Sequence, residues 1–180
     1  MLCAPVAHAH TPYQQWRVYR QRHLVVGTCK ADPESYPLGK RIVERLAQEL
    51  PESNAQVARA PDQLRLASLV TTDQVRIVIL TEQEGVQLRF GRPPFEEYGP
   101  YPLTVLMEFG RHLMLAGQDL PDHHGWLVCH ALSNNFAGAR VPQPASDAPL
   151  LLHPGAAAFA QGKPMPAPPA DADAPPKKAG

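Results

Sequence analysis

Several residues near the start of the chain are of the types that hold anions. In the stretch LVVGTCKADPESYPLGKRI, residues 24–42, an apolar run stops at Gly27-Thr28, a polar loop with Lys30 follows, and a helical segment opens at Tyr36. The backbone N–H groups at a helix N-terminus attract negative charge, and a lysine ammonium adds to that attraction. These residues predict a cradle for a small carboxylate. The alternative is a tight strand-to-helix turn that needs only its glycine, with a half-buried tyrosine beside it.

A second group of residues has the types of metal ligands. Asp122-His123-His124 resembles a motif of metal-dependent phosphoesterases, but the further Asp and His ligands of such a site are not evident. His130 could share a helix face with His123, next to Cys129, where imidazole and thiolate would suit Zn, Cu or Ni. We favour the alternative, in which Trp126 and its neighbours cover a sheet while His123 and His130 stand in solvent.

The cysteines and the remaining polar residues do not predict an enzyme. Cys29 and Cys129 could form a disulfide if their Cα atoms came within about 7 Å, but we favour two separate thiols. No CxxC occurs, so the sequence does not support a structural zinc site. No Ser-His-Asp or Cys-His arrangement can be assembled, and the ligand set of a metal-dependent phosphoesterase is incomplete. We therefore expect no catalytic activity and no metal or cofactor, and an enzyme is a third hypothesis that rests only on Asp122-His123-His124.

The amino-acid composition limits the kinds of partner that the protein is expected to bind. The 17 Lys and Arg residues balance the 17 Asp and Glu residues, which argues against a nucleic-acid partner. A chain of 180 residues with 44% hydrophobic residues can bury the core of one domain. No apolar run approaches the length needed to span a bilayer.

The two ends of the chain are expected to lie outside the folded domain. In residues 1–20, Ala7-His8-Ala9 has the small-x-small form of a signal-peptidase site, although the preceding apolar stretch is short and lacks a charged region. We interpret this segment as the end of an export signal, with an ordinary N-terminal tail as the alternative. Residues 163–180 are rich in Pro and Ala and are predicted to be disordered. The domain is therefore expected over residues 21–162.

Hydrophobic periodicity predicts alternating strands and helices. Apolar residues recur every four positions through residues 35–50, which is typical of an amphipathic helix, and Pro51 ends it. We expect Ser35 or Tyr36 to cap that helix. The expected strands are 23–28, 55–60, 75–81 and 150–152; the expected helices are 35–50, 61–71, 121–135 and 153–161. Residues 103–116 could form a helix or two short strands, and we favour two extended pieces around Gly110-Arg111. Residues 82–102 are read as a connector and 138–149 as a loop. This order predicts a mainly parallel α/β sheet with helices on its faces.

Two separated motifs resemble the TAXI-type solute-binding proteins of TRAP transporters. Members of that family begin with a strand, a Gly-Thr or Gly-Ser, a short loop and a Tyr-Pro-Leu-Gly, and they carry a His-Pro-Gly-Ala near the C-terminus. The matching positions here are Gly27, Thr28, Tyr36, Pro37, Leu38, Gly39 and His153, Pro154, Gly155, Ala156. The resemblance implies one three-layer α/β lobe of the type II periplasmic-binding fold, a periplasmic location and a small carboxylate ligand. It also implies that Gly27, Thr28, Lys30, Tyr36 and Gly39 bind that ligand.

The chain departs from the family in ways that favour a second function. Asp73 and Arg76 stand where the family usually has a Gly and an Asp, and residues 82–118 are too few for the family's second lobe. These receptors enclose the solute between two lobes, so a single lobe would bury a ligand poorly. The first hypothesis is a receptor that delivers a carboxylate to TRAP membrane subunits. The alternative is an accessory or subunit protein of a larger envelope complex, in which an exposed lobe face contacts a partner or a second copy of the chain.

Overall fold

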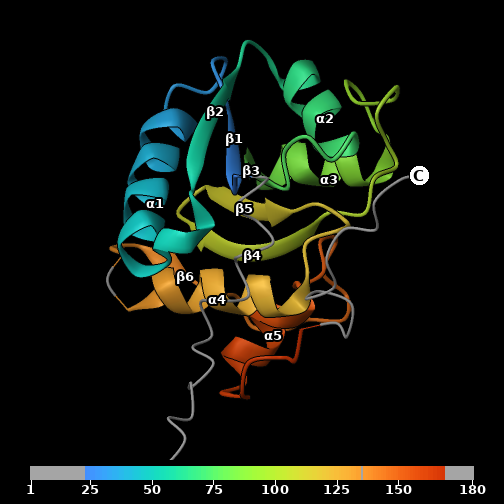
Figure 1. Ribbon diagram of the computed structural model, residues 1–180. Coiled ribbons are helices and arrows are strands. Elements are labelled where there is room, and N and C mark those ends of the chain that lie inside the picture. The colour runs from blue at the N-terminus through green and yellow to red at the C-terminus, as the bar shows by residue number, and fades with distance from the viewer. Residues whose placement is uncertain (1–22, 135, 169–180) are drawn as a thin grey trace, which may run out of the picture.

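The computed structural model describes residues 23–134 and 136–168, and it forms an α/β fold (Figure 1). The segment 1–20, in which an export signal is expected, lies outside these residues, as do residues 169–180. The elements in chain order are β1 (Val25–Cys29), α1 (Ser35–Glu49), a 3-10 turn (Pro51–Ser53), β2 (Gln56–Ala60), α2 (Gln63–Thr71), β3 (Ile77–Thr81), α3 (Glu82–Phe90), β4 (Thr104–Phe109), β5 (His112–Ala116), α4 (Asp122–Ser133), β6 (Ala139–Arg140) and α5 (Pro154–Ala160).

The strands form one mixed sheet of six, in the order β2-β1-β3-β5-β4-β6. β1 pairs in parallel with both β2 and β3, as the alternation of strands and helices predicts. The expectation of a mainly parallel sheet is wrong, because β5 is antiparallel to β3 and β4, and β6 is antiparallel to β4. The antiparallel pairing of β4 with β5 follows from the tight turn at Gly110-Arg111, where Gly110 has a φ of +64°. A turn this short can join only antiparallel strands.

Helices cover both faces of the sheet and complete three layers (Figure 1). On one face, α1 and α4 bury a core that contains Ile42, Leu46 and Val128. On the other face, α2 packs over a core that contains Leu66 and Val78, and Leu88 of α3 joins it. The predicted three-layer α/β arrangement is therefore present, with the parallel strands β2-β1-β3 forming one half of the sheet and the hairpin strands the other.

Helix α3 lies where the sequence was interpreted as a connector. Its polar sequence, EQEGVQLRF, carries little apolar periodicity, so its pattern did not indicate a helix. Its ends are nevertheless well capped: the Thr81 hydroxyl accepts from the Glu84 N–H, the Glu84 carboxylate reaches back to the Thr81 N–H, and Gly91 ends the helix with a φ of +61°. These caps satisfy backbone groups that a helix end otherwise leaves unpaired.

The C-terminal half is held by close contacts between α4 and α5. His153 caps α5: its Nδ1 accepts from the Gly155 N–H at 3.1 Å, and its Nε2 donates to the Leu120 carbonyl at 3.0 Å. The expected strand at 150–152 contributes only one isolated bridge, between Leu152 and Val105. Within the expected loop 138–149, residues 139–140 form the short strand β6.

The folded chain continues beyond residue 162, where a disordered tail was expected to begin. The Lys163 N–H donates to the Ala158 carbonyl, and the Lys163 carbonyl accepts from the Trp126 indole N–H at 3.1 Å. Met165 is partly buried and packs against the core that contains Ile42, Leu46 and Val128. None of the helices in residues 23–134 and 136–168 is long and apolar enough to cross a membrane.

Candidate functional site

One edge of the sheet gathers the residues that the sequence singled out. The parallel strands β1, β2 and β3 end there at Cys29, Ala60 and Thr81, and the register pairs Thr81 with His112 at the start of β5. The Gly110-Arg111 turn therefore lies beside the β1–α1 loop, residues 30–34. In open α/β sheets, ligands bind beyond the carboxyl ends of the parallel strands. We call this region the carboxyl edge.

The Gly27-Thr28 turn predicted from the sequence is not present, because β1 continues to Cys29. A Cβ on Gly27 would lie 2.7 Å from Leu66 Cδ1, so the glycine permits close packing of α2 on the sheet. Thr28 is fully buried, and its hydroxyl donates to the Ala58 carbonyl at 2.8 Å. Packing and strand pairing thus account for both residues.

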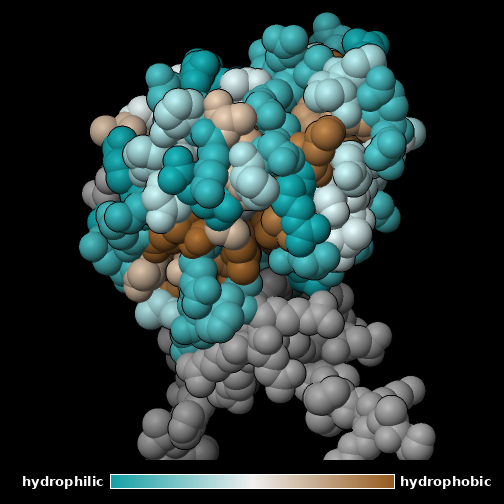
Figure 2. Space-filling view, turned by 90° about the horizontal axis from the view of Figure 1, so that it is seen from above, coloured by the Kyte–Doolittle hydropathy of each residue, from teal (hydrophilic) through white to brown (hydrophobic). Residues whose placement is uncertain are grey.

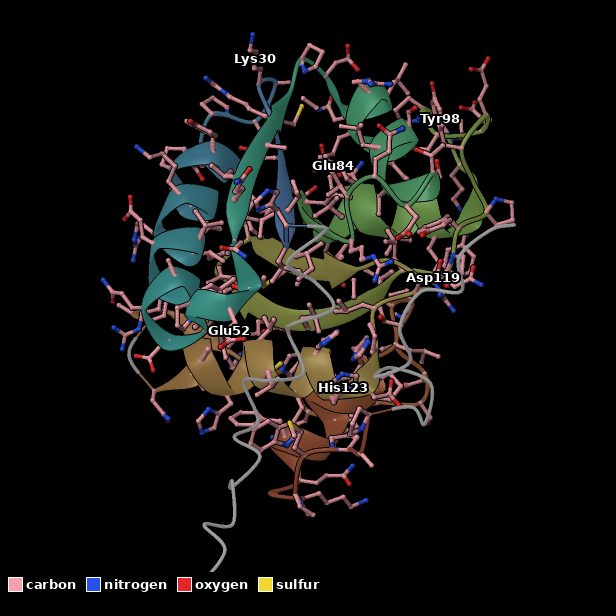
Figure 3. The ribbon with its side chains drawn as sticks, viewed as in Figure 1. Lys30, Glu52, Glu84, Tyr98, Asp119 and His123 are labelled. Atoms are coloured by element: carbon pink, nitrogen blue, oxygen red, sulfur yellow. The ribbon has the colours of Figure 1, made fainter. Side chains whose placement is uncertain are left out.

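The other predicted ligand residues are spread around the start of α1. Gly39 is buried, and a Cβ there would lie 2.7 Å from Thr28 Cγ2, so it lets the helix approach the strand. The Lys30 backbone N–H donates to the Ala60 carbonyl, while its side chain is exposed and extends from the tip of the loop (Figure 3). Tyr36 is half-buried, and the Arg59 guanidinium lies 4.8 Å from its ring centroid. The geometry therefore leaves Lys30, Tyr36 and Arg59 accessible, and encloses Thr28 and Gly39.

Sequence reasoning missed the central charged cluster of the carboxyl edge. Asp32, which is 8% exposed, lies with one carboxylate oxygen 2.5 Å from Nε2 of the buried His112. Its other oxygen accepts from Arg111 Nη2 at 3.0 Å and from the Glu34 N–H at 3.2 Å. Arg111 also binds the exposed Glu34 carboxylate at 3.0 Å. We name these four residues, Asp32, Glu34, Arg111 and His112, the Asp32 cluster.

The loop that carries the Asp32 cluster is held at both ends by Ser35. Its hydroxyl donates to the Asp32 and Cys29 carbonyls at 2.9 and 3.1 Å and accepts from the Cys29 N–H at 3.2 Å. Ser35 therefore ties the loop to the strand, and the prediction that Ser35 or Tyr36 caps α1 is wrong. The N-cap residue of α1 is Glu34, which makes no side-chain capping bond.

The cluster places the protein's own negative charge at the start of α1. The Asp32 carboxylate accepts from the backbone N–H of the N-cap residue, and its remaining donors are Arg111 and His112. A helix N-terminus favours an anion at this place, and here an aspartate supplies it. A solute carboxylate at this place would meet the carboxylates of Asp32 and Glu34. Their cationic partner, Arg111, is already bound to both. Figure 2 shows this end of the molecule as mainly hydrophilic, with hydrophobic residues confined to patches.

The Cys29 thiol lies at the carboxyl edge, where its surroundings disfavour the thiolate form. Burial raises the pKa of its thiol, and the Glu84 and Asp62 carboxylates add to the rise, although backbone N–H groups of Ala31 and Asp32 act in the opposite direction. Only the thiolate is strongly nucleophilic, and the raised pKa lowers the thiolate fraction of Cys29 at neutral pH.

The structure bears on the alternatives that the sequence left open: a disulfide or two separate thiols for the cysteines, and a metal site or solvent exposure for the histidines. Cys29 lies in the core under α2, whereas Cys129 of α4 lies in the core on the opposite face, and both are free thiols. His130 is exposed, as expected, and its ring stacks on that of Trp126. The expectation that His123 stands in solvent is wrong, since it is 2% exposed. Within the described ranges, no group of three or more His, Cys, Asp and Glu residues could hold a metal ion.

Two features of the missed cluster were visible in the sequence. Asp32-Pro33-Glu34 precedes a predicted helix, and Arg111-His112 follows the glycine of a predicted turn. What joins them is the antiparallel pairing of β5 with β3, and this pairing was not predicted. A scan against protein-family models, a search of curated proteins and a search of solved structures each found no match to this chain.

Proposed function

We propose that this chain is a non-catalytic interaction protein, an α/β lobe that contacts a protein partner and does not trap a small solute. The observation that carries the proposal is the Asp32 carboxylate at the start of α1. It accepts from the N-cap N–H and from Arg111, which are the donors that a solute carboxylate would need. Because these donors already bind Asp32, the anion site expected from the sequence is occupied by the protein's own carboxylate.

The sequence motifs support a location for this function. The resemblance to TAXI-type receptors favours export to the periplasm, and the single lobe favours a role without a closing partner lobe. We therefore propose an accessory or subunit protein of a larger envelope complex. A second copy of the chain could also cover the lobe, and light scattering of the purified protein measures that directly.

Chemical rescue by added acetate tests whether the Asp32 carboxylate occupies the anion site at the start of α1. The Asp32→Gly variant removes the carboxylate and opens a space beside Arg111. We expect this variant to melt at a lower temperature, and we expect acetate to raise that temperature more than chloride at equal ionic strength. The wild-type protein should respond equally to both salts. An equal response of the variant to both salts would contradict the assignment of Asp32 as the internal anion.

A carboxylate receptor is the second candidate, favoured by the exposed Lys30 and by Arg59 beside Tyr36. In this function the solute binds at the outer side of the α1 start and is delivered to TRAP membrane subunits. Isothermal titration with acetate, succinate and pyruvate tests it. Saturable binding to the wild-type protein that is weakened by Arg59→Gln, but not by Arg65→Gln on α2, would support the receptor and count against the interaction protein.

Affinity capture tests the partner. The tagged full-length chain would be purified from an envelope extract of its source cells and quantified by mass spectrometry. Stoichiometric recovery of an envelope protein other than a transporter subunit is the expected result. Recovery of TRAP membrane subunits would instead favour the receptor, and recovery of no partner at all would count against both.

A further inference from the structure

A cavity of about 230 Å³ lies between the sheet and the chain segment 142–150. Its floor is apolar and comes from Val105 of β4, Leu113 of β5 and Leu150, which are 5%, 9% and 6% exposed. Glu82, the first residue of α3, and Glu108 of β4 also line it. The cavity is separate from the Asp32 cluster, because it shares no residue with it.

The two carboxylates of the cavity differ in how they are neutralised. Glu108 accepts from both Nε and Nη2 of Arg140 on β6. Glu82 makes no ion pair or hydrogen bond with any other residue in the described part of the chain. The N-terminus of α3 does not need Glu82 as a cap, since the Thr81 and Glu84 capping box already satisfies it. The exposed Glu82 therefore gives the cavity lining one carboxylate without an ionic partner in the described part of the chain, in addition to the apolar floor.

We propose that this cavity binds a small organic cation, an ammonium group carried on a short alkyl chain. The alkyl chain lies on Val105, Leu113 and Leu150, and the ammonium group lies against the Glu82 carboxylate. A volume of about 230 Å³ equals the share of roughly eight water molecules in liquid water, which suits a chain of about four carbons. Burial of the alkyl chain and pairing of the ammonium both favour this ligand over an anion.

The probe for this site is n-butylamine, which is fully charged at neutral pH, titrated into ¹⁵N-labelled full-length protein. Millimolar affinity is expected for a ligand of this size. Chemical-shift changes should concentrate on the backbone amides of Val105, Leu113 and Leu150. The neutral analogue n-butanol and the anion butyrate should each bind at least about tenfold more weakly. Equal affinity for n-butanol and n-butylamine would overturn the cation site, as would shifts that fall elsewhere on the protein.

Matched variants distinguish the contribution of the Glu82 charge to n-butylamine binding from the contribution of the cavity volume. Glu82→Gln should weaken n-butylamine binding about tenfold or more, whereas Glu96→Gln, which removes the same charge from a residue that is also exposed but lies outside the cavity, should leave it unchanged. Ala148→Leu adds volume to the cavity lining and should weaken n-butylamine and n-butanol alike. Thermal melts of each variant verify that it is folded. Equal effects of the two glutamine substitutions would show general charge attraction and would refute the site.

Discussion

The imidazole of His112 and the carboxylate of Asp32 lie 2.5 Å apart, although 80 residues separate them along the chain. Asp32 belongs to the loop that leads from β1 into α1, and His112 begins β5, the antiparallel neighbour of β3. The pair therefore connects the parallel half of the sheet to the hairpin half at the carboxyl edge. Because both groups are almost fully buried, loss of the Asp32 carboxylate would remove a hydrogen bond of the His112 imidazole at a place where water does not readily replace it.

Asp32→Asn tests the stability that this pair contributes. The amide removes the charge that faces Arg111 and His112, and we expect the free energy of unfolding to fall by roughly 2–3 kcal/mol in urea denaturation. Glu34→Gln is the matched control, because the Glu34 side chain is 69% exposed and pairs with the same arginine. The free energy of unfolding of the Glu34→Gln variant should fall by less than about 0.5 kcal/mol. Similar losses in both variants would show that burial of Asp32 is energetically unimportant.

Mild acid should destabilise the protein through its buried histidines. Burial lowers the folded-state pKa of His153 and of His123 below their ordinary value of 6.5. At pH values below 6.5 the unfolded state then binds more protons than the folded state, so stability is lost as pH falls and is fully present above 6.5. For His153 burial is the main cause, and protonation of Nδ1 would also break the hydrogen bond that this nitrogen accepts from the Gly155 N–H.

Urea denaturation on both sides of that pH measures the effect. The free energy of unfolding should decrease from pH 7.5 to pH 5.5 (about one unit above and below the ordinary histidine pKa). The His153→Asn variant keeps a side-chain acceptor at the N-cap of α5 but does not titrate, so its decrease should be smaller. A decrease of the same size in the variant would place the acid sensitivity elsewhere.

Substitution of Gly155 tests the close packing of α5 on α4. A Cβ at this position would lie 1.8 Å from the Asp122 carbonyl oxygen and 2.7 Å from the Trp126 nitrogen, both backbone atoms that cannot rotate away. We expect Gly155→Ala to cost roughly 3 kcal/mol or to prevent folding. Gly110→Ala is the comparison: it has open space around the added carbon but a φ of +64°, so it should cost about 1 kcal/mol. Thermal melts of the two variants rank them, and the reverse order would contradict this packing.

Because Cys29 and Cys129 are buried in the two hydrophobic cores, we expect their thiols to react slowly. Burial raises the pKa of both groups, and they are 2% and 0% exposed. In a Cys3→Ser background, a thiol reagent such as Ellman's reagent should label neither residue in the native protein and both in urea. A disulfide between them is not expected under oxidising conditions, because the sheet separates them. Rapid labelling of one thiol in native buffer would show local opening around it.

The sequence predicted regular elements best where a strong apolar pattern and a clear boundary coincided. Helix α1 has apolar residues at every fourth position and Pro51 after it, and the predicted span agrees with the observed one within a residue. Helix α3 was missed because its stability comes from its caps and from single contacts such as Leu88, which do not produce a periodic pattern. The loop segments 30–34 and 110–111 were recognised as turns, but not as neighbours.

The sequence by itself determined several local features: the span of α1, the break at Gly110-Arg111 within the apolar segment 103–116, and the β-α-β-α-β order that makes β1, β2 and β3 parallel. These follow from periodicity, proline and glycine, which act over a few residues. Only the tertiary structure decided that β5 inserts beside β3, because long-range pairing depends on packing between distant segments. That pairing brings His112 and Arg111 to Asp32, and so places an internal carboxylate where the sequence alone predicted an external one.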